Sequence, residues 1–395
     1  MKKSVVVLLV LLFCLTPLLL FAGGGKKEVV REEKFREVPL SWILDLEEEL
    51  SENILTPEGP NGEPITSAER LELSDEEIRD ARELDLGDYL FMAATLDITE
   101  ILNKEGMDDV LATVGKQPIK FLGADSISEQ IEQVNSMAAR AGELSFIVAQ
   151  AFEAETTGPA FVELARAGVP QLHNWTTPRG LSGEENYIGL VDADGYGQGA
   201  AAARILSYMM GEEGKVGIIY FALEQWTNVM RLRGAEETFA QYPGIEVVAR
   251  EGFTDPAQGR DIALGMLQAN PDIDAIWATW MDGPATGAAE AVLELGRVGE
   301  VIVAAPDLGG IPGARFIADT NHPIVGAGAA DTIEMGENSI RAALKWHLGK
   351  KDEVRGIYTA SHVIPIVRTN LVDGFNKQTR GTLGNLPREV LEMLE

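Results

Sequence analysis

The chain of 395 residues contains one cysteine, Cys14. This residue lies in an apolar N-terminal segment, so the sequence beyond that segment has no thiol. Without thiols, that part of the chain cannot form an internal disulfide, bind a metal through cysteine or use a cysteine nucleophile. Phe13 precedes Cys14, where a lipoprotein signal has a small residue, so we do not expect a lipid anchor.

Basic side chains are also scarce. The 33 Lys and Arg residues stand against 62 Asp and Glu, and the formal net charge is −29. A nucleic-acid-binding protein needs basic surface to neutralise phosphates, so this balance argues against a nucleic-acid partner. Hydrophobic residues make up 45% of the chain, which is ordinary for a protein with a core. The length allows about two to three domains.

The common motifs of metal, cofactor and nucleophile sites are missing. No two of the four histidines have the H-x-x-x-H spacing, and no G-x-S-x-G motif occurs. Glycines cluster at 195–199 and at 309–313, but neither cluster has the G-x-G-x-x-G spacing of a dinucleotide site. We therefore expect no metal, no cofactor and no enzymatic activity.

The N-terminus has the pattern of an export signal. Lys2 and Lys3 precede an almost wholly apolar stretch over 5–21, and Leu20-Phe21-Ala22 is a candidate cleavage site. The pattern predicts a signal peptide over 1–22 and a periplasmic or otherwise exported protein. The apolar run approaches the length of a membrane span, so an uncleaved membrane anchor is the alternative.

Residues 23–87 are highly charged and weakly patterned, with a Pro/Gly-rich patch at 57–64. We interpret them as a linker or N-terminal extension. Two short helices are predicted within this segment. Residues 40–50 have amphipathic spacing, and Ser74 with Glu77 has the spacing of a capping box at the start of the second helix.

From Tyr89 onward, short apolar or β-branched runs alternate with helical patterns. Strands are predicted at 89–97, 119–122, 146–149, 169–172, 187–191, 216–220, 245–248, 275–278, 301–305, 324–328 and 361–367. Helices are predicted up to 112, then at 126–141, 159–167, 201–209, 229–242, 261–268, 285–295 and 332–348, followed by a polar tail. This alternation predicts βαβ units with parallel sheets, an α/β fold class. The stretch 186–210 changes from strand through turn to helix, and we interpret it as a crossing between two α/β lobes.

Polar and aromatic residues follow several of the predicted strands. Open parallel sheets bind ligands in the crevice at the carboxyl ends of their strands. The residues at these ends are Thr95, Asp97, His173, Asn174, Trp175, Phe221, Trp226, Trp280, Asp282 and Asp307, with Arg231 and Arg233 opening a following helix. Aromatic faces cover the C–H face of a sugar ring, while Asp, Asn and Arg bond its hydroxyls. For each tryptophan the alternative is core packing, and for each aspartate it is helix capping.

Several short motifs together carry a resemblance to a known family. They are Ala167-Gly168-Val169-Pro170, VDADGYGQG at 191–199, Arg231-Leu-Arg233-Gly234, Asp282 five residues before Gly287, Ala305-Pro-Asp307, and IPIVRTN at 364–370. In this order they resemble the periplasmic-binding-protein-like type I superfamily, in particular the ribose-type sugar-binding proteins of ABC importers. The resemblance runs from about residue 89 to 370.

The resemblance implies two Rossmann-like lobes with parallel sheets, joined by a three-strand hinge. The crossings would lie near 192–194, 328–331 and 361–364. Lobe 1 would comprise 88–192 and 331–362, and lobe 2 would comprise 193–330 and 363–395. A ligand would bind between the lobes and hold them closed, and the closed monomer would dock on an ABC permease in the membrane.

The ligand contacts that the resemblance implies are Arg233, Asp307, Met281 or Asp282, and the pair His173-Asn174. The chain also departs from the ribose-type pattern. Asp97 opens the segment where those proteins have paired aromatics, and His173-Asn174 stands where they have Asp-Arg. A glutamine expected near the third crossing falls on Ala329 or Ala330. We therefore expect a ligand other than ribose, stacked on Trp175, Trp226 and Trp280.

The sequence thus predicts an exported solute-binding protein that delivers a sugar or a related small polar solute to an ABC importer. A ligand-sensing subunit of a membrane receptor or kinase would use the same fold, and the sequence does not separate the two. A secreted α/β enzyme is a third alternative. It would need a nucleophile and a base at the strand ends, where the sequence offers only carboxylates and one histidine.

Overall fold

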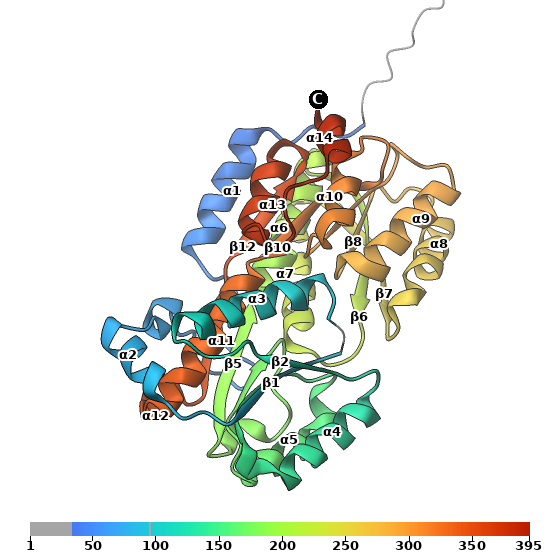
Figure 1. Ribbon diagram of the computed structural model, residues 1–395. Coiled ribbons are helices and arrows are strands. Elements are labelled where there is room, and N and C mark those ends of the chain that lie inside the picture. The colour runs from blue at the N-terminus through green and yellow to red at the C-terminus, as the bar shows by residue number, and fades with distance from the viewer. Residues whose placement is uncertain (1–33, 95) are drawn as a thin grey trace, which may run out of the picture. The chain divides into compact units, whose positions relative to one another are not determined.

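The computed structural model describes residues 34–94 and 96–395 (Figure 1). The predicted signal peptide over 1–22 and the predicted site residue Thr95 lie outside the described residues. No helix in the described part of the chain combines the length and the apolarity that a bilayer crossing requires.

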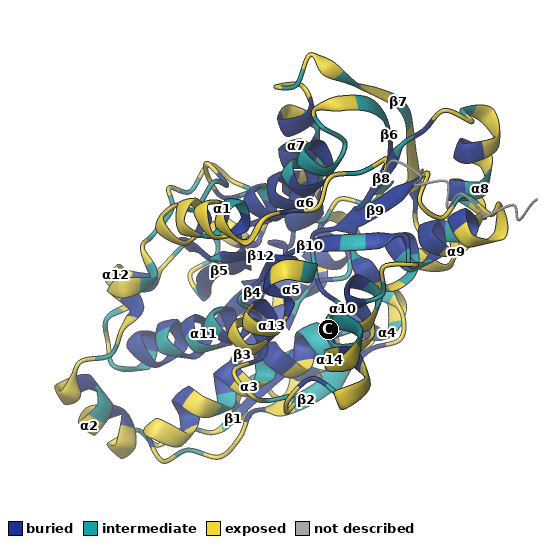
Figure 2. Cartoon of the chain, turned by 90° about the horizontal axis from the view of Figure 1, so that it is seen from above, coloured by how far each residue is buried: buried dark blue, intermediate teal, exposed yellow. Residues whose placement is uncertain are grey.

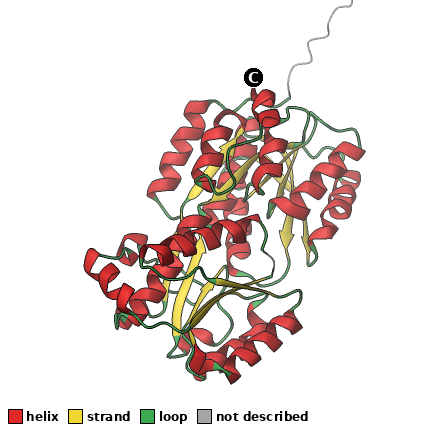
Figure 3. Ribbon diagram, in the orientation of Figure 1, coloured by secondary structure: helices red, strands yellow, loops and turns green. Residues whose placement is uncertain are grey.

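Two six-stranded sheets organise the described residues (Figures 1 and 3). The first contains β1 (Asp88–Ala93), β2 (Lys120–Gly123), β3 (Leu144–Gln150), β4 (Gln171–Asn174), β5 (Tyr187–Ala193) and β11 (Ile357–Ser361). The second contains β6 (Glu213–Phe221), β7 (Gly244–Phe253), β8 (Ala275–Ala278), β9 (Ile302–Ala305), β10 (Ile324–Ala330) and β12 (Val363–Val367). We call the first sheet with its helices lobe 1 and the second lobe 2.

The two sheets have the same plan. The strand orders are β11-β5-β4-β3-β1-β2 and β12-β10-β9-β8-β6-β7. All neighbours in the first sheet are parallel. In the second sheet only β12 is antiparallel to its neighbour, β10. The predicted α/β class with two parallel sheets is therefore confirmed.

Helices cover the sheets of both lobes (Figure 3). Those of lobe 1 are α3 (Ile98–Thr113), α4 (Ile127–Ala139), α5 (Ala154–Arg166), α11 (Thr332–His347) and α12 (Lys351–Val354). Those of lobe 2 are α6 (Gly195–Met209), α7 (Trp226–Phe239), α8 (Gly259–Ala269), α9 (Thr286–Glu294), α10 (Gly310–Ala318), α13 (Leu371–Thr379) and α14 (Arg388–Leu394). The last two occupy the region for which the sequence predicts a polar tail. They pack because Leu371, Phe375 and Val390 enter the core of lobe 2.

Burial explains the composition of the strands. Central strands such as β5 and β9 are wholly buried, because helices cover both faces of the sheet, and they are continuous runs of mostly apolar residues. The edge strands β2 and β7 are largely exposed or half-buried, as Figure 2 shows.

Helices α6 and α7 pack closely through glycine. A methyl group at Gly199 would overlap the carbonyl oxygen of Arg231, and one at Gly234 would overlap that of Tyr196. Gly197 leaves room for the carboxylate of Asp194, which caps α6 by accepting a hydrogen bond from Gly197 N. The glycines at 195–199 thus serve helix packing and capping.

The chain passes between the sheets three times, after β5, after β10 and between β11 and β12. We call these three crossings the hinge. Neighbouring crossings are hydrogen-bonded, since Asp194 N donates to Ser361 O over 3.1 Å and Asp331 N donates to His362 O over 3.0 Å. The run 361–367, predicted as one strand, therefore divides between β11 and β12, because the chain changes sheets at His362.

Residues 34–87 are packed on both lobes, unlike the linker that their composition suggests. Helix α1 (Leu40–Glu52) buries Ile43, Leu46 and Leu50 against α6 and β12 of lobe 2. Helix α2 (Asp75–Glu83) lies on lobe 1, where Ala81 joins the core. The predicted capping box at the start of α2 is present. A short apolar face on each helix is enough for docking. The outer faces of both helices are exposed (Figure 2).

The segment between these two helices runs along the hinge. We call residues 53–67 the strap. Near its start, Leu55 and Thr56 donate hydrogen bonds to Asp194. Near its end, Thr66 N donates to Tyr358 O of β11 over 2.7 Å. The strap therefore joins the helix on lobe 2 to the helix on lobe 1 across the crossings.

Candidate functional site

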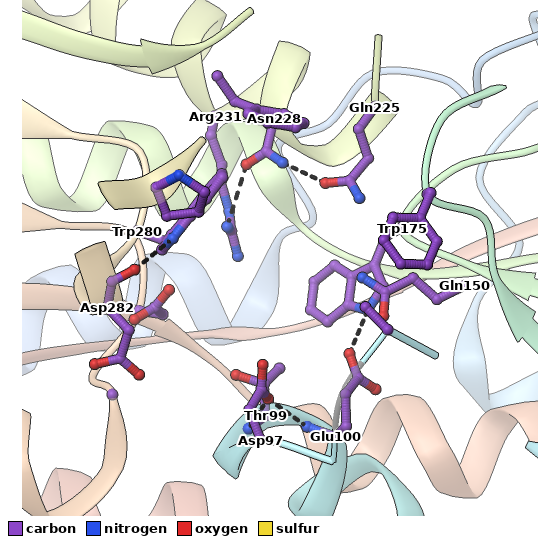
Figure 4. A pocket seen from close by; sticks show the side chains of 16 residues that line it. Asp97, Thr99, Glu100, Gln150, Trp175, Gln225, Asn228, Arg231, Trp280 and Asp282 are labelled. Atoms are coloured by element: carbon purple, nitrogen blue, oxygen red, sulfur yellow. Dashed lines mark hydrogen bonds between the residues drawn. The ribbon is translucent and has the colours of Figure 1, made fainter. Parts of the chain in front are cut away.

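A cavity of about 370 Å³ lies between the two lobes (Figure 4). Its volume falls in the range of about 300 to 1,000 Å³ that is typical of small-molecule sites. The residues that line it from lobe 1 are Ala94, Asp97, Thr99, Glu100, Gln150, Phe152 and Trp175. Those that line it from lobe 2 are Phe221, Gln225, Asn228, Arg231, Pro256, Trp280, Asp282, Asp307 and Gly309.

The cavity lies at the point where the strand order reverses in each sheet. In lobe 1, β1 and β3 are neighbours; Asp97 follows β1 and Gln150 ends β3. In lobe 2, β6 and β8 are neighbours; Phe221 ends β6 and Trp280 follows β8. Doubly wound sheets form their ligand crevice at such switch points, because the connections on either side run to opposite faces of the sheet. The cavity therefore joins the ligand crevices of two sheets.

Trp175 forms part of the lobe 1 wall and is held in an unusual conformation. Its φ of 66° lies in the left-handed region, which residues other than glycine rarely adopt. Its Nε1 donates to Glu100 Oε1 over 3.1 Å. The backbone N–H and the hydroxyl of Thr227, from lobe 2, both donate to the Trp175 carbonyl oxygen, over 3.0 and 2.8 Å. These bonds fix the indole at the cavity wall.

Trp280 forms the opposite aromatic wall. Its ring packs edge-to-face against Phe221 and Phe253, with centroid separations of 5.2 and 5.0 Å. Its Nε1 donates to the carbonyl oxygen of Asp282 over 2.8 Å. The ring orientation is thus set by packing and by one hydrogen bond (Figure 4).

Arg231 is the basic residue that lines the cavity, and it is only 7% exposed. Its Nε and Nη2 both donate to Gln198 Oε1, over 3.2 and 3.1 Å. Its guanidinium lies 5.7 Å from the centre of the Trp175 ring. Burial lowers the pKa of Arg231, and the charges of Asp307 and Asp192 oppose this shift. An arginine remains charged in such a setting, so one positive charge is held at the cavity.

Four carboxyl groups also line the cavity, and two of them have strongly raised pKa values. Burial raises the pKa of Asp307 to about 6; Arg231 opposes the shift and Asp282 adds to it. Burial, with a contribution from Asp97, raises the pKa of Glu100 to about 8. Glu100 is therefore protonated at neutral pH. Burial and Asp97 also raise the pKa of Asp282.

Besides Phe221 and Arg231, which the sequence also places near strand ends, five of the residues predicted for the site line this cavity. They are Asp97, Trp175, Trp280, Asp282 and Asp307. They meet because all follow the carboxyl ends of strands, which parallel pairing places at one edge of each sheet.

Three other predicted residues are buried behind the cavity wall. His173 packs edge-to-face on Phe161, and burial lowers its pKa to about 3, so it is neutral. Asn174 Nδ2 donates to Val191 O over 2.7 Å. Met281 lies in the lobe 2 core, and its N–H donates to Asp307 Oδ1 over 3.0 Å. These residues are placed to support the wall, whereas the resemblance implied direct contact with ligand.

Two predicted residues lie away from the cavity. Arg233 is exposed and pairs with Glu237 Oε1 over 2.7 Å, beside the strap. Trp226 is the first residue of α7 and does not line the cavity. Arg233 lies outside the cavity because residues two apart on a helix point about 200° apart. The packing of α7 on α6 turns Arg231 to the cavity and Arg233 to the surface.

Sequence reasoning also missed several lining residues. They are Glu100, Gln150, Phe152, Gln225 and Asn228. The rule of strand ends would have found Gln150 and Phe152, because β3 ends at Gln150. No local signal marks Glu100 or Asn228, which lie inside the first turns of α3 and α7.

Metal binding gains no support from the described residues, which contain no group of three or more His, Cys, Asp and Glu side chains close enough to hold an ion.

Residues 92–351, more than half of the chain, match a family described as periplasmic binding protein domain. The chain belongs to this family. Its α/β architecture is the type I periplasmic binding fold, as the resemblance in the sequence implied.

Individual relatives of this periplasmic binding protein match over part of their length. Over 139 residues it is 35% identical to the D-allose-binding periplasmic protein of Escherichia coli (strain K12), covering 35% of this chain and 44% of that protein. Over 211 residues it is 26% identical to the xylitol-binding protein of Mycolicibacterium smegmatis, covering 52% of this chain and 57% of that protein. The chain thus spans about half the length of these relatives.

Solved structures share the fold. An arabinose-binding protein from Geobacillus stearothermophilus superposes with a TM-score of 0.62 at 22% identity, covering 73% of this chain and 99% of that one. At this identity the likeness concerns the fold of the periplasmic binding protein and leaves its ligand open.

Proposed function

We propose that this periplasmic binding protein captures a sugar or a related polyol between its lobes and delivers it to an ABC importer. The observation that carries the proposal is the cavity, which lies at the switch points of both sheets. A solute in that position contacts both lobes at once. Ligand binding is therefore coupled to the relative position of the lobes.

The lining suits a polyhydroxylated molecule. Trp175 and Trp280 offer apolar faces for the C–H groups of a ring or a chain. Gln150, Gln225 and Asn228 offer amide donors and acceptors for hydroxyl groups. The names of the relatives support the same class, since D-allose, xylitol and arabinose all carry several hydroxyls.

The hinge supplies the mechanism of capture. Three crossings link the lobes, and a ligand that binds both lobes stabilises the closed arrangement. The closed monomer then presents both lobes to the membrane permease, after export directed by the signal peptide. No chemical step on the solute is required.

A thermal-shift screen of pentoses, hexoses and linear polyols, with amino acids as the comparison set, tests this function. A ligand at one hundred times its Kd stabilises the folded state by about 2.7 kcal/mol. We expect at least one sugar or polyol, neutral or substituted, to raise the melting temperature by several degrees. A shift given by an amino acid and by no sugar or polyol would overturn the proposal.

A further inference from the structure

The first turn of α7, in lobe 2, is capped by lobe 1. Its N-cap residue Gln225 makes no side-chain cap hydrogen bond, so the first backbone N–H groups of the helix need partners elsewhere. Trp226 N donates to Thr176 Oγ1 over 3.3 Å. Thr227 N donates to Trp175 O over 3.0 Å. Both acceptors belong to lobe 1, so these bonds depend on the contact between the lobes.

Trp175 receives this helix and also lines the cavity. Its φ of 66° is one that a residue other than glycine keeps only where its surroundings hold it. On the indole side, Nε1 donates to Glu100 within lobe 1 (Figure 4). On the backbone side, the carbonyl oxygen is held by Thr227 of lobe 2. The conformation that presents the indole to the cavity therefore depends on Thr227.

The Thr227 hydroxyl lies between two oxygens. Its Oγ1 is 2.8 Å from Trp175 O and 2.6 Å from Asp192 Oδ1. A hydroxyl has one hydrogen, and a backbone carbonyl oxygen only accepts, so the hydrogen of Thr227 belongs in the bond to Trp175. The shorter contact, to Asp192, then needs a hydrogen on the carboxyl group. Both contacts are hydrogen bonds if Asp192 Oδ1 is protonated and donates to Thr227.

The surroundings of Asp192 favour this neutral form. Asp192 is 1% exposed, and its Oδ2 accepts no hydrogen bond from the described residues. The titratable groups around it are Arg231 of α7, Asp194 at the first crossing and Tyr358 of β11. Arg231 directs its Nε and Nη2 to Gln198 Oε1. Burial raises the pKa of Asp192 to about 7; Asp194 adds to the shift, while hydrogen bonds to the carboxylate and the charge of Arg231 oppose it.

We propose that Thr227 and Asp192 are positioning residues for solute binding, and that the chain of hydrogen bonds from Asp192 through Thr227 to Trp175 includes a proton on Asp192. This inference rests on the proposed function, because it concerns how Trp175 is set for the solute. When a solute brings the lobes together, Asp192 is enclosed against Thr227 and takes up a proton from solvent. When the lobes separate, water reaches the carboxyl group and the proton leaves. Capture is therefore linked to proton uptake.

Calorimetry tests the proton on Asp192. The probe is the pentose, hexose or linear polyol that gives the largest shift in the thermal-shift screen. Its heat of binding is measured at pH 6.5 in phosphate and in imidazole, whose ionisation enthalpies differ, which gives the number of protons taken up. We expect the parent protein to take up more protons than Asp192→Asn, by up to about one. Glu100 and Asp307 line the cavity in both proteins, so the difference isolates Asp192.

The pH profile of affinity gives a second measurement. Enclosure raises the pKa of Asp192, so the bound state favours the protonated form. Affinity for the probe should therefore fall severalfold as the pH rises from 5 to 7.5 in the parent protein. In Asp192→Asn the fall should be smaller, because asparagine does not titrate.

Two variants of Thr227 test the positioning role. Thr227→Val keeps the shape of the side chain and removes the hydroxyl, whereas Thr227→Ser keeps the hydroxyl. We expect Thr227→Val to weaken binding of the probe by roughly fivefold and Thr227→Ser to stay within about twofold of the parent. Melting temperatures of the ligand-free variants check folding. If Asp192→Asn does not fold, this pair and the pH profile of the parent decide.

The outcomes separate this inference from the proposed function. Equal proton uptake by the parent and Asp192→Asn, a flat pH profile of the parent, or equal affinity of Thr227→Val and Thr227→Ser would each overturn the inference. The proposed function would remain, because the probe would still bind. Failure of every sugar and polyol in the screen would overturn both.

Discussion

Thr56 is bonded to Asp194, although 138 positions separate the two residues in the chain. The backbone N–H and the hydroxyl of Thr56 both donate to Asp194 Oδ1, over 2.9 and 2.7 Å. Leu55 N donates to the other carboxylate oxygen over 2.7 Å. Both Thr56 and Asp194 are fully buried. Because Asp194 lies at the first crossing of the hinge and caps α6, the strap is fixed to the point where the lobes join.

Thr56→Val should therefore destabilise the protein. The substitution keeps the size of the side chain and removes the hydroxyl donor to a buried carboxylate. We expect a loss of about 1 to 3 kcal/mol in the free energy of unfolding, measured by urea denaturation. Thr254→Val, at an exposed position, is the control. Equal stability of the two variants would show that this bond contributes nothing.

Arg231 and Arg233 should differ sharply in their effect on ligand affinity. Arg231 lines the cavity, whereas Arg233 is paired with Glu237 at the surface. A charge-assisted hydrogen bond contributes about 1.5 to 3 kcal/mol, so Arg231→Met should weaken binding by roughly tenfold or more. Arg233→Met should stay within about twofold. Calorimetry with a ligand from the screen measures both, and the melting temperature of the ligand-free variants checks folding. The reverse pattern would support the contact that the resemblance implied.

The buried pair of Glu77 and Lys345 should make stability fall in acid. Lys345 Nζ lies 2.8 Å from Glu77 Oε1, and Lys350 Nζ lies 2.6 Å from the same oxygen. Burial raises the pKa of Glu77, but the two lysines more than offset this and hold it far below its usual value of 4.5. The stabilisation is thus fully present above about pH 4.5 and is lost as the pH falls below it.

Glu77→Gln tests this contribution. At pH 7 the variant should lose about 3 kcal/mol, because Lys345 is left buried without its main partner. The difference from the parent protein should shrink as the pH is lowered from 5 to 3, which urea denaturation at each pH would show. A difference that is independent of pH would mean that the ion pair is not its source.

Gly199→Ala should destabilise the contact between α6 and α7. The added methyl group overlaps the backbone of Arg231, and overpacking typically costs about 1 to 3 kcal/mol. Gly265→Ala is the matched control, because Gly265 lies inside α8 with open space around it. There the higher helix propensity of alanine should stabilise the protein by roughly 0.5 to 1 kcal/mol. Thermal unfolding should therefore show a lower melting temperature for Gly199→Ala and a higher one for Gly265→Ala. An unchanged melting temperature in Gly199→Ala would contradict the close packing.

Glu100→Gln should stabilise the protein, and more so at higher pH. The raised pKa of about 8 means that folded Glu100 holds a proton at pH values where the unfolded chain has lost it. Stability therefore falls as the pH rises from about 4.5 to 8. Glutamine does not ionise, so the gain should grow from pH 5 to pH 8, reaching on the order of 2 to 4 kcal/mol. Glu105→Gln, at an exposed position of α3, serves as control, and a gain that does not grow with pH would contradict the burial effect.

Local patterns in the sequence were sufficient to predict most of the helices and strands. The predicted range 275–278 coincides with β8, and the capping box of Ser74 and Glu77 forms as expected. These features depend on contacts within a few residues, so a single sequence contains the information. The region of the cavity was also predictable, since Asp97, Trp280 and Asp307 follow parallel strands whose carboxyl ends share one edge.

The sequence by itself therefore determined the alternation of strands and helices, the α/β class and the strand ends at which a ligand can bind. Tertiary structure decided which side chains reach the cavity. The packing of Gly199 and Gly234 sets the rotation of α7, and that rotation presents Arg231 to the cavity and Arg233 to solvent. Tertiary structure also decided that residues 34–87 pack on both lobes, because Thr56 finds its partner in a carboxylate far along the chain. Both outcomes depend on long-range contacts, which no local pattern encodes.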